Sequence, residues 1–251
     1  LILGAVSKDI IITPEDTEYS IGGAVVYSSV ALQHLGANIL AVTKLHPDDR
    51  QALEVFDRHG VPHRVRDSPS TTSIRNTYHT ADRDRRTCEA LGMVAPFELD
   101  DVPEDVTADV YYLGGLMKGE FPEAFVLAMC KRGKVAIDAQ GFMRVNENGP
   151  MVFRDWDNKK EVIAAVHYLK TDAAEAETLT GEKDRITAAR MLASWGAKEV
   201  MLTHSSEVLV CVDGAIHAAP FTSRNLSGRT GRGDTCFATY CYWRSKHGPE
   251  E

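Results

Sequence analysis

Short apolar stretches alternate along this chain with stretches in which apolar residues recur at three- and four-residue spacing. The first pattern is typical of buried strands, and the second of helices with one covered face. Strands are predicted over residues 1–6, 10–12, 39–44, 110–113, 134–137 and 200–203, and as a hairpin over 208–212 and 216–218. Helices are predicted over 24–35, 47–59, 121–132, 173–179, 186–195 and 231–243, while 162–170 indicates a helix running into a strand. Repeated β-α units predict a mostly parallel sheet with helices on both faces.

The stretch between residues 61 and 92 differs from this alternation, because β-forming residues such as Thr71, Ile74 and Thr80 are interleaved with polar ones. Polar alternation of this kind indicates exposed strands. We therefore expect residues 10–20 and 71–91 to form a small β lid beside the main sheet. Neither a linker nor an internal repeat divides the chain, so the sequence predicts a single α/β domain over residues 1–251.

Charge and composition narrow the possible functions. The 251 residues carry 28 Lys and Arg against 36 Asp and Glu, a net charge of -8, which argues against a nucleic-acid partner. No apolar run approaches the roughly 18 residues of a membrane helix. Five scattered cysteines without a CxxC pair favour a reducing compartment, so we expect a cytoplasmic protein. The chain lacks an initiator Met, and we expect its true N-terminus to be missing.

The most informative segment covers residues 228–238 and reads GRTGRGDTCFA. Glycines at the entry to a helix let bare backbone N–H groups converge on an anion. Asp234, in the first helical turn, would then lie beside that anion and accept a proton from a hydroxyl nucleophile. A tight glycine turn in which Asp234 only caps the helix explains the spacing equally well. The spacing fits neither the dinucleotide-binding glycine pattern nor a Walker A loop, and the cell-adhesion tripeptide at 232–234 is a chance match.

This segment resembles the Gly-Ala-Gly-Asp motif of the ribokinase-like (PfkB) carbohydrate kinases, with Arg232 in place of the usual Ala. Other elements stand where that family has them: Asp9 after the first strand, Gly22 and Gly23 before a helix, and Asp172-x-x-Glu175 in place of Asn-x-x-Glu. The matches span nearly the whole chain in the family's order. The resemblance implies a three-layer α/β/α sandwich with a β lid, and an ATP-dependent kinase that phosphorylates a hydroxyl group.

The resemblance also implies roles for individual residues. Asp234 would be the base, and the N–H groups of Gly231, Arg232 and Gly233 would form the anion hole. The donor would lie against Asp172, Thr203, Ser205 and Thr230. Glu175, with Asp172, would organise Mg²⁺ through water, although a solvated helix face explains Glu175 as well.

A finer resemblance concerns the acceptor. The run DAQGFMR at 138–144, together with RDW at 154–156, is similar to the subgroup that includes inositol kinases, so myo-inositol is the favoured acceptor. A polyol offers only hydroxyls, and side chains suited to grip them are Asp9, Arg75, Asn76 and Gln140, beside Gly22 and Gly23. Exposed strand positions would explain Arg75 and Asn76 equally well, and a loop turn would explain Gln140.

Departures from the family pattern keep alternatives open. The glycines usual after the nucleotide strand are absent after Thr203, and the chain ends soon after the Asp234 helix, so we expect a truncated C-terminal end. A nucleoside or another sugar could be the acceptor, or the chain could be a catalytically silent polyol-binding sensor. Exposed lid strands also predict a homodimer through the lid.

Overall fold

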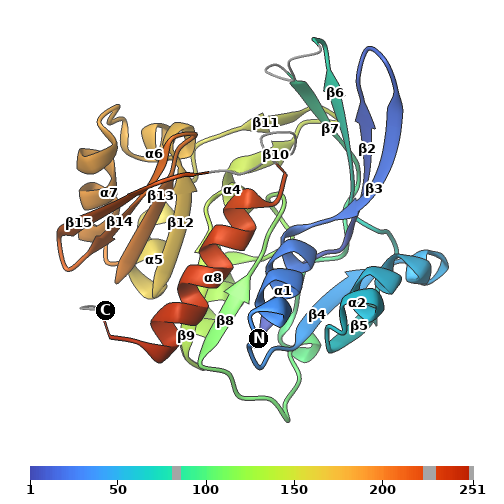
Figure 1. Cartoon of the computed structure of the whole chain (residues 1–251), viewed down its shortest axis with the longest axis horizontal. Coiled ribbons are helices and arrows are strands. Elements are labelled where there is room, and N and C mark those ends of the chain that lie inside the picture. Colours follow the sequence, from blue (N-terminus) through green and yellow to red (C-terminus); the bar gives the residue numbers. More distant parts are fainter. Residues whose placement is uncertain (81–85, 223–229, 249–251) are drawn as a thin grey trace.

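The computed structural model describes residues 1–80, 86–222 and 230–248. The lid stretch 81–85 and the first residues of the glycine-rich segment, Gly228 and Arg229, lie outside these ranges. A nine-stranded sheet forms the centre of the molecule (Figure 1). Its strands follow the order β15 (Ala215–Pro220), β14 (Glu207–Val212), β13 (Glu199–Thr203), β12 (Tyr168–Asp172), β9 (Lys134–Asp138), β8 (Val110–Leu113), β1 (Ile2–Leu3), β4 (Ala41–Leu45) and β5 (His63–Asp67). Strands β13 to β5 pair in parallel, and β14 and β15 are antiparallel.

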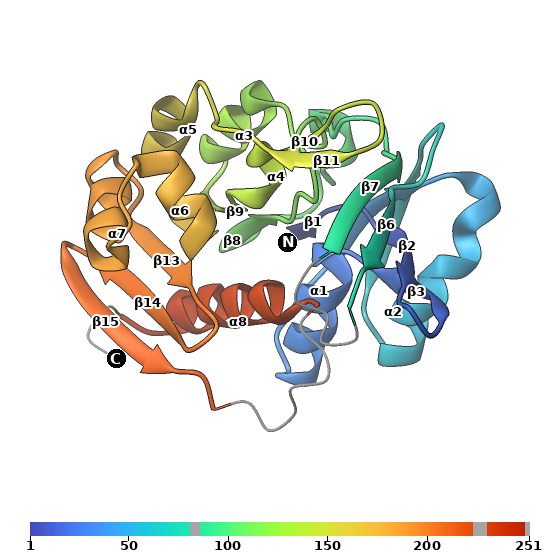
Figure 2. The same ribbon diagram turned by 90° about the horizontal axis from the view of Figure 1, so that it is seen from above.

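Helices cover both faces of this sheet, as Figure 2 shows. One face carries α1 (Ala24–His34), α2 (Glu54–His59) and α8 (Arg232–Lys246), and the other carries α3 (Glu123–Cys130), α5 (Lys159–Ala165), α6 (Ala173–Thr180) and α7 (Arg185–Ser194). Neighbouring strand residues point to opposite faces. On β8, Tyr112 therefore packs with Phe237 of α8, while Leu113 joins the core under α3, and both are buried. The expected three-layer α/β/α architecture is confirmed.

A second sheet of four strands stands beside the first. Its order is β3 (Thr17–Gly22), β2 (Ser7–Ile12), β6 (Ser73–Tyr78) and β7 (Arg86–Gly92). Within the described residues these strands form the expected lid. One strand from the polar stretch lies elsewhere: β5 pairs with β4 and forms the edge of the main sheet. Polar alternation indicated its exposed side chains but not which sheet it would join.

Two further segments depart from the expected elements. The predicted helix over 47–59 is a 3-10 turn, Pro47–Leu53, followed by α2. A short hairpin of β10 (Arg144–Asn146) and β11 (Met151–Phe153) was not expected, although Asn148 and Gly149, both at positive φ, are typical hairpin turn residues. Among the described residues, no helix is long and apolar enough to cross a membrane.

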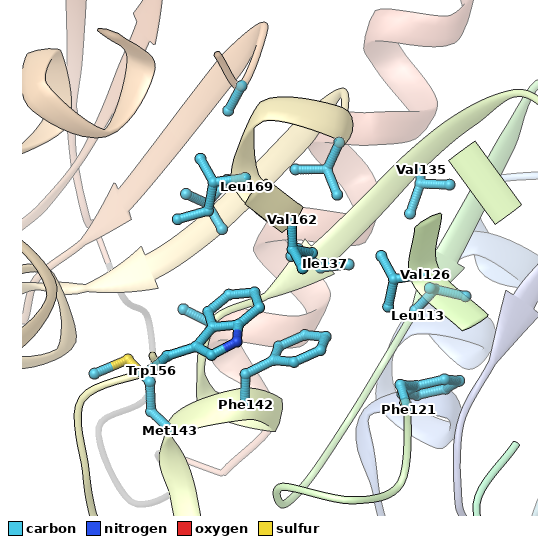
Figure 3. Close-up of a cluster of buried hydrophobic side chains, with 14 of the residues drawn as sticks. Leu113, Phe121, Val126, Val135, Ile137, Phe142, Met143, Trp156, Val162 and Leu169 are labelled. Carbon is cyan, nitrogen blue, oxygen red and sulfur yellow. The ribbon is translucent and has the colours of Figure 1, made fainter. Parts of the chain in front are cut away.

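Aromatic stacking fixes the loop in front of this hairpin. The rings of Phe142, in the short helix α4 (Gln140–Met143), and Trp156 stack with centroids 4.3 Å apart (Figure 3). The Trp156 Nε1 donates a hydrogen bond of 2.6 Å to Glu123 Oε1 on α3. This packing anchors the segment from Gln140 to Arg144 beside the carboxyl end of β9.

Candidate active site

Polar side chains gather where parallel strands of the main sheet end. Asp138 closes β9, Lys170 and Asp172 lie at the end of β12, and Thr203 closes β13. The carboxyl ends of parallel strands share one edge of the sheet, which is where open α/β folds bind ligands. The first turn of α8 reaches the same edge, because Gly233 and Lys170 are neighbours in space.

The backbone conformation at the start of α8 requires glycine. Gly231 is its N-cap with φ of 78°, and a Cβ there would lie 2.4 Å from Cγ of Tyr27. The first bond of the helix runs from the Thr235 N–H to the Gly231 carbonyl at 2.9 Å. The N–H groups of the turn before Thr235 lie at the positive end of the helix. Arg232 and Gly233 of the expected anion hole stand in this turn, with Gly231 as its cap.

A cavity of about 440 Å³, called here the lid cavity, lies between this edge and the lid. From α8 and the sheet edge it is lined by Asp138, Asp172, Thr203, Thr230, Gly231, Gly233 and Asp234. Gln140, just after β9, also lines it, and from the side of the lid it is lined by Asp9, Gly23 and Asn76. A Cβ at Gly23, whose φ is 104°, would lie 2.3 Å from the Ala5 carbonyl oxygen, so only glycine allows this close approach.

A second cavity of about 610 Å³, the outer cavity, opens on the far side of the α8 turn. Ser205, Arg232 and Phe221 line it. Both cavities also contact Asp172, Thr203 and Gly233. Molecules in the two cavities would therefore meet at the first turn of α8.

Buried charges surround Asp234. Burial and, to a smaller extent, the nearby Asp138 carboxylate raise the pKa of Asp234 to about 6, against the opposing effect of Lys170. The Lys170 Nζ donates a bond of 2.7 Å to Asp138 Oδ2, with both residues buried. Burial disfavours the Lys170 ammonium, but the attraction of Asp138 and Glu175 is stronger and lifts its pKa above the usual range. Asp234 is thus a carboxylate that is ionised at neutral pH and gains a proton only slightly below it.

Unsatisfied polar atoms face the lid cavity from β2. Asp9 Oδ1 and Ser7 Oγ are buried and have no hydrogen-bond partner among the described residues. Leaving a buried carboxylate oxygen unpaired is costly. Burial accordingly raises the pKa of Asp9. A ligand that donates hydroxyl hydrogens would satisfy these atoms.

Glu175 is almost completely buried, with 3% of its surface exposed, and it caps α6 together with Asp172. The Asp172 N–H donates to Glu175 Oε2 and the Glu175 N–H to Asp172 Oδ1, each at 2.8 Å. In the part of the chain that the structure describes, no three His, Cys, Asp or Glu side chains are grouped to hold a metal by themselves. Mg²⁺ commonly keeps several waters and binds through one or two carboxylates plus substrate phosphates. Asp172, which opens onto both cavities, fits that mode of binding.

Three expected site residues, Gly22, Arg75 and Glu175, line neither cavity. The Arg75 guanidinium pairs with Glu89 Oε2 at 3.1 Å, on the opposite side of β6 from Asn76. Gly22 lies behind Tyr27, which lines the lid cavity, and a Cβ on Gly22 would be 2.8 Å from the Tyr27 hydroxyl. Conversely, sequence reasoning assigned no role to several residues that line the lid cavity, namely Tyr27, Tyr78, Arg86, Leu116, Asp138, Arg144 and Lys170. The positions of Asp138 and Lys170 at the ends of strands were the signal that could have found them.

Comparison with known sequences places this geometry among kinases. The family model described as pfkB family carbohydrate kinase matches residues 3–251. A curated relative, the cytidine kinase of Thermococcus kodakarensis (strain ATCC BAA-918 / JCM 12380 / KOD1), is 26% identical over 245 residues, covering 93% of this chain and 84% of that protein.

Three solved structures are more similar. A pyrophosphate-dependent kinase of the ribokinase family, in a sulfate complex, is 36% identical with a TM-score of 0.90, covering 97% of this chain and 86% of the other. One complexed with a pyrophosphate analog and myo-inositol is 35% identical with a TM-score of 0.88, covering 95% and 84%. A third concerns a pyrophosphate-dependent myo-inositol-1 kinase that a double substitution converts into a myo-inositol-3 kinase; it is 34% identical with a TM-score of 0.87, covering 95% and 82%.

Proposed function

Because the chain belongs to the pfkB family of carbohydrate kinases, we propose that it transfers a phosphoryl group from pyrophosphate to one hydroxyl of myo-inositol or a closely related cyclic polyol. One observation carries this proposal. The lid cavity and the outer cavity meet at the first turn of α8, where Asp234 faces the lid cavity and Gly233 contacts both. An acceptor and a donor placed in them would adjoin the same base and the same N–H groups.

The proposed donor differs from the ATP that the family resemblance implies. Two cations flank the shared turn: Arg232 lines the outer cavity, and the Lys170 Nζ lies 3.2 Å from where a Cβ on Gly233 would be. Pyrophosphate consists only of charged phosphoryl groups, which Arg and Lys bind well. Ser205 and Val208 stand where the family pattern has glycines after Thr203, which removes the bare backbone that nucleotide phosphates approach. Pyrophosphate dependence in the three similar solved structures supports this donor.

The proposed acceptor is supported by the polar lining of the lid cavity. Asp9 offers a buried oxygen without a partner, and Asn76 and Gln140 offer amide groups. Gln140 is held in place because its Oε1 accepts a bond of 2.7 Å from Arg144. Fixed acceptors and donors of this kind suit a ring whose only polar groups are hydroxyls.

In the proposed reaction, Asp234 takes the proton from the acceptor hydroxyl while the oxygen of that hydroxyl forms a bond to the transferred phosphorus. The bond from that phosphorus to the leaving phosphate breaks, and the N–H groups of α8 stabilise the equatorial oxygens as charge spreads over them. Lys170 and Arg232 neutralise the donor. A magnesium ion held through Asp172 and, by way of water, Glu175 would supply further charge neutralisation.

Phosphorylation assays with a panel of donors and acceptors test the proposal. Pyrophosphate and ATP are each combined with myo-inositol, ribose, fructose, adenosine and cytidine, and products are followed by phosphorus NMR. We expect a myo-inositol monophosphate to form with pyrophosphate, at a rate at least about tenfold above that with ATP, which corresponds to roughly 1.4 kcal/mol of activation free energy.

Other results would replace the proposal with a named alternative. Turnover of cytidine or adenosine would identify a nucleoside kinase, in line with the cytidine kinase relative. Binding of myo-inositol in calorimetry, with neither donor consumed, would identify a polyol-binding domain without catalysis.

The choice of hydroxyl is proposed to depend on a pair of lid residues. Asn76 and Cys88 lie opposite each other on β6 and β7, and the Cys88 thiol donates to Asn76 Oδ1 at 3.1 Å. That bond orients the amide, and Asn76 lines the lid cavity. Changing the hydrogen bond that the amide makes with the ring would alter which hydroxyl faces Asp234. In the similar myo-inositol-1 kinase, two substitutions are enough to change that choice.

We expect Asn76→Leu to change the ratio of inositol monophosphate isomers by about tenfold, the effect of losing one well-formed hydrogen bond. Proton NMR of the products measures that ratio. The matched control is Arg75→Gln, one residue away on the opposite side of the lid, which should leave the ratio unchanged. An unchanged ratio in Asn76→Leu would remove Asn76 from the specificity determinants.

Two expectations stay predictions. A homodimer through the lid is consistent with the exposed Tyr19 on β3, whose side chain is 80% exposed. A cytoplasmic location rests on the cysteine usage alone.

A further inference from the structure

A fully buried carboxylate lies behind the wall of the lid cavity. Glu120, in the loop that follows β8, has no exposed surface, and burial raises its pKa to about 7 even though backbone and hydroxyl donors favour its charged form. Neither cavity contacts it. Burying such a group is costly, so its partners indicate what it contributes.

The two oxygens of Glu120 join two walls of the lid cavity. Oε2 accepts a bond of 2.7 Å from the N–H of Leu116, whose side chain lines the cavity. Oε1 accepts a bond of 2.9 Å from the hydroxyl of Thr72, which is also fully buried. Glu120 thus connects the loop after β8 to the residue just before β6.

Thr72 extends this connection to the residues that face a ligand. Its carbonyl oxygen accepts from the Lys8 N–H at 2.9 Å, next to Asp9 on β2. Its hydroxyl oxygen accepts from the Val94 N–H at 3.2 Å, just beyond β7. Four residues further along β6 from Thr72 is Asn76. The Glu120 carboxylate therefore links the start of lid strand β6 to the loop after β8 of the main sheet.

We propose that Glu120, acting through Thr72 and Leu116, is a positioning residue that sets the distance between the lid residues Asp9 and Asn76 and the base Asp234, and so controls the binding of the acceptor rather than the donor. This inference rests on the proposed function. It predicts that removing the hydrogen bonds of Glu120 weakens the binding of the polyol, which contacts the lid. The binding of the donor in the outer cavity should be unaffected.

The test compares Glu120→Met with Glu120→Gln. Methionine fills the same space but leaves the Leu116 N–H and the Thr72 hydroxyl unpaired. Glutamine keeps the bond from the Leu116 N–H through its carbonyl, and its amide can donate to the second lone pair of the Thr72 oxygen, so that the link is kept with the Thr72 bond reversed. We expect Glu120→Met to raise KM for myo-inositol about tenfold, with KM for pyrophosphate within about twofold of the wild type, and Glu120→Gln to recover most of the loss.

Two further comparisons separate positioning from loss of stability. Thr72→Val should raise KM for myo-inositol several-fold and Thr72→Ser should not, which keeps the inference testable even if Glu120→Met fails to fold. Glu199→Met is the matched control: Glu199 is a buried glutamate at the start of β13, bonded to Arg244 and Tyr240, and its loss should lower the melting temperature without changing either KM.

Equal increases of both KM values, or a lower melting temperature with unchanged KM in Glu120→Met and Thr72→Val, would overturn the inference. A wild-type chain that phosphorylates no polyol would instead overturn the proposed function, which the wild-type assay reveals by itself.

Discussion

Replacing Asp234 by asparagine is expected to lower kcat roughly a thousandfold while changing KM for the donor little. Asparagine keeps the shape of the side chain but cannot accept a proton from the acceptor hydroxyl, and general-base catalysis typically contributes about 10²- to 10⁴-fold. The helix turn and its N–H groups remain, so donor binding survives. Steady-state kinetics with each substrate varied in turn measure both effects.

The pH dependence of the wild type provides a second measurement of the same assignment. Burial raises the pKa of Asp234 to about 6, so the carboxylate is ionised above that pH and protonated below it. Only the ionised form accepts a proton, so kcat/KM should fall about tenfold per pH unit below roughly pH 6. The asparagine variant should lack this acid limb.

The control for this prediction is Asp184→Asn. Asp184 caps α7 by accepting from the Thr187 N–H at 2.9 Å and lines neither cavity, so the variant should keep both the rate and the acid limb. Near-normal turnover by Asp234→Asn would remove Asp234 as the base.

Replacing Lys170 by methionine is expected to have the second large effect, on both stability and donor use. The Lys170 and Asp138 side chains are 8% and 3% exposed and bonded at 2.7 Å. Removing the cation leaves the Asp138 carboxylate buried and unpaired, which costs about 3–5 kcal/mol of unfolding free energy. Urea unfolding of the variant and the wild type measures this loss.

The double variant Lys170→Met with Asp138→Asn separates stability from function. A neutral amide in place of the carboxylate removes the unpaired charge, and its oxygen can still accept the bond of 3.1 Å from the Gln140 N–H. We expect most of the lost stability to return. KM for pyrophosphate should stay raised at least about tenfold, because the ammonium beneath Gly233 is still missing. Restored donor use in the double variant would show that the donor does not need this charge.

The local pattern of apolar and polar residues was sufficient to predict most of the strands and helices. The strand predicted at 110–113 is β8, because strands covered on both faces need apolar side chains at consecutive positions. The predicted hairpin turn also holds, with Asp213 and Gly214 both at positive φ between β14 and β15. Pattern was insufficient for β5, whose polar side chains indicate an exposed edge but carry no information about which sheet has that edge.

The candidate site divides in the same way. The glycine-rich turn and Asp234 lie within a few residues, so their chemistry was visible in the sequence. Lys170 and Asp138 are 32 residues apart, and only the parallel pairing of β9 with β12 makes them neighbours. Arg75 and Asn76 are adjacent in sequence, yet the pleat of β6 sends one side chain to Glu89 and the other into the lid cavity.

The sequence by itself determined the alternation of strands and helices, the glycine entry to α8 and the family resemblance, since each depends on residues close together in the chain. Only the tertiary structure decided which charges surround Asp234, that two cavities meet at one helical turn, and that Glu120 links the lid to the sheet. Those contacts join residues that are distant in sequence. They arise from the order in which strands pair, which no local periodicity specifies.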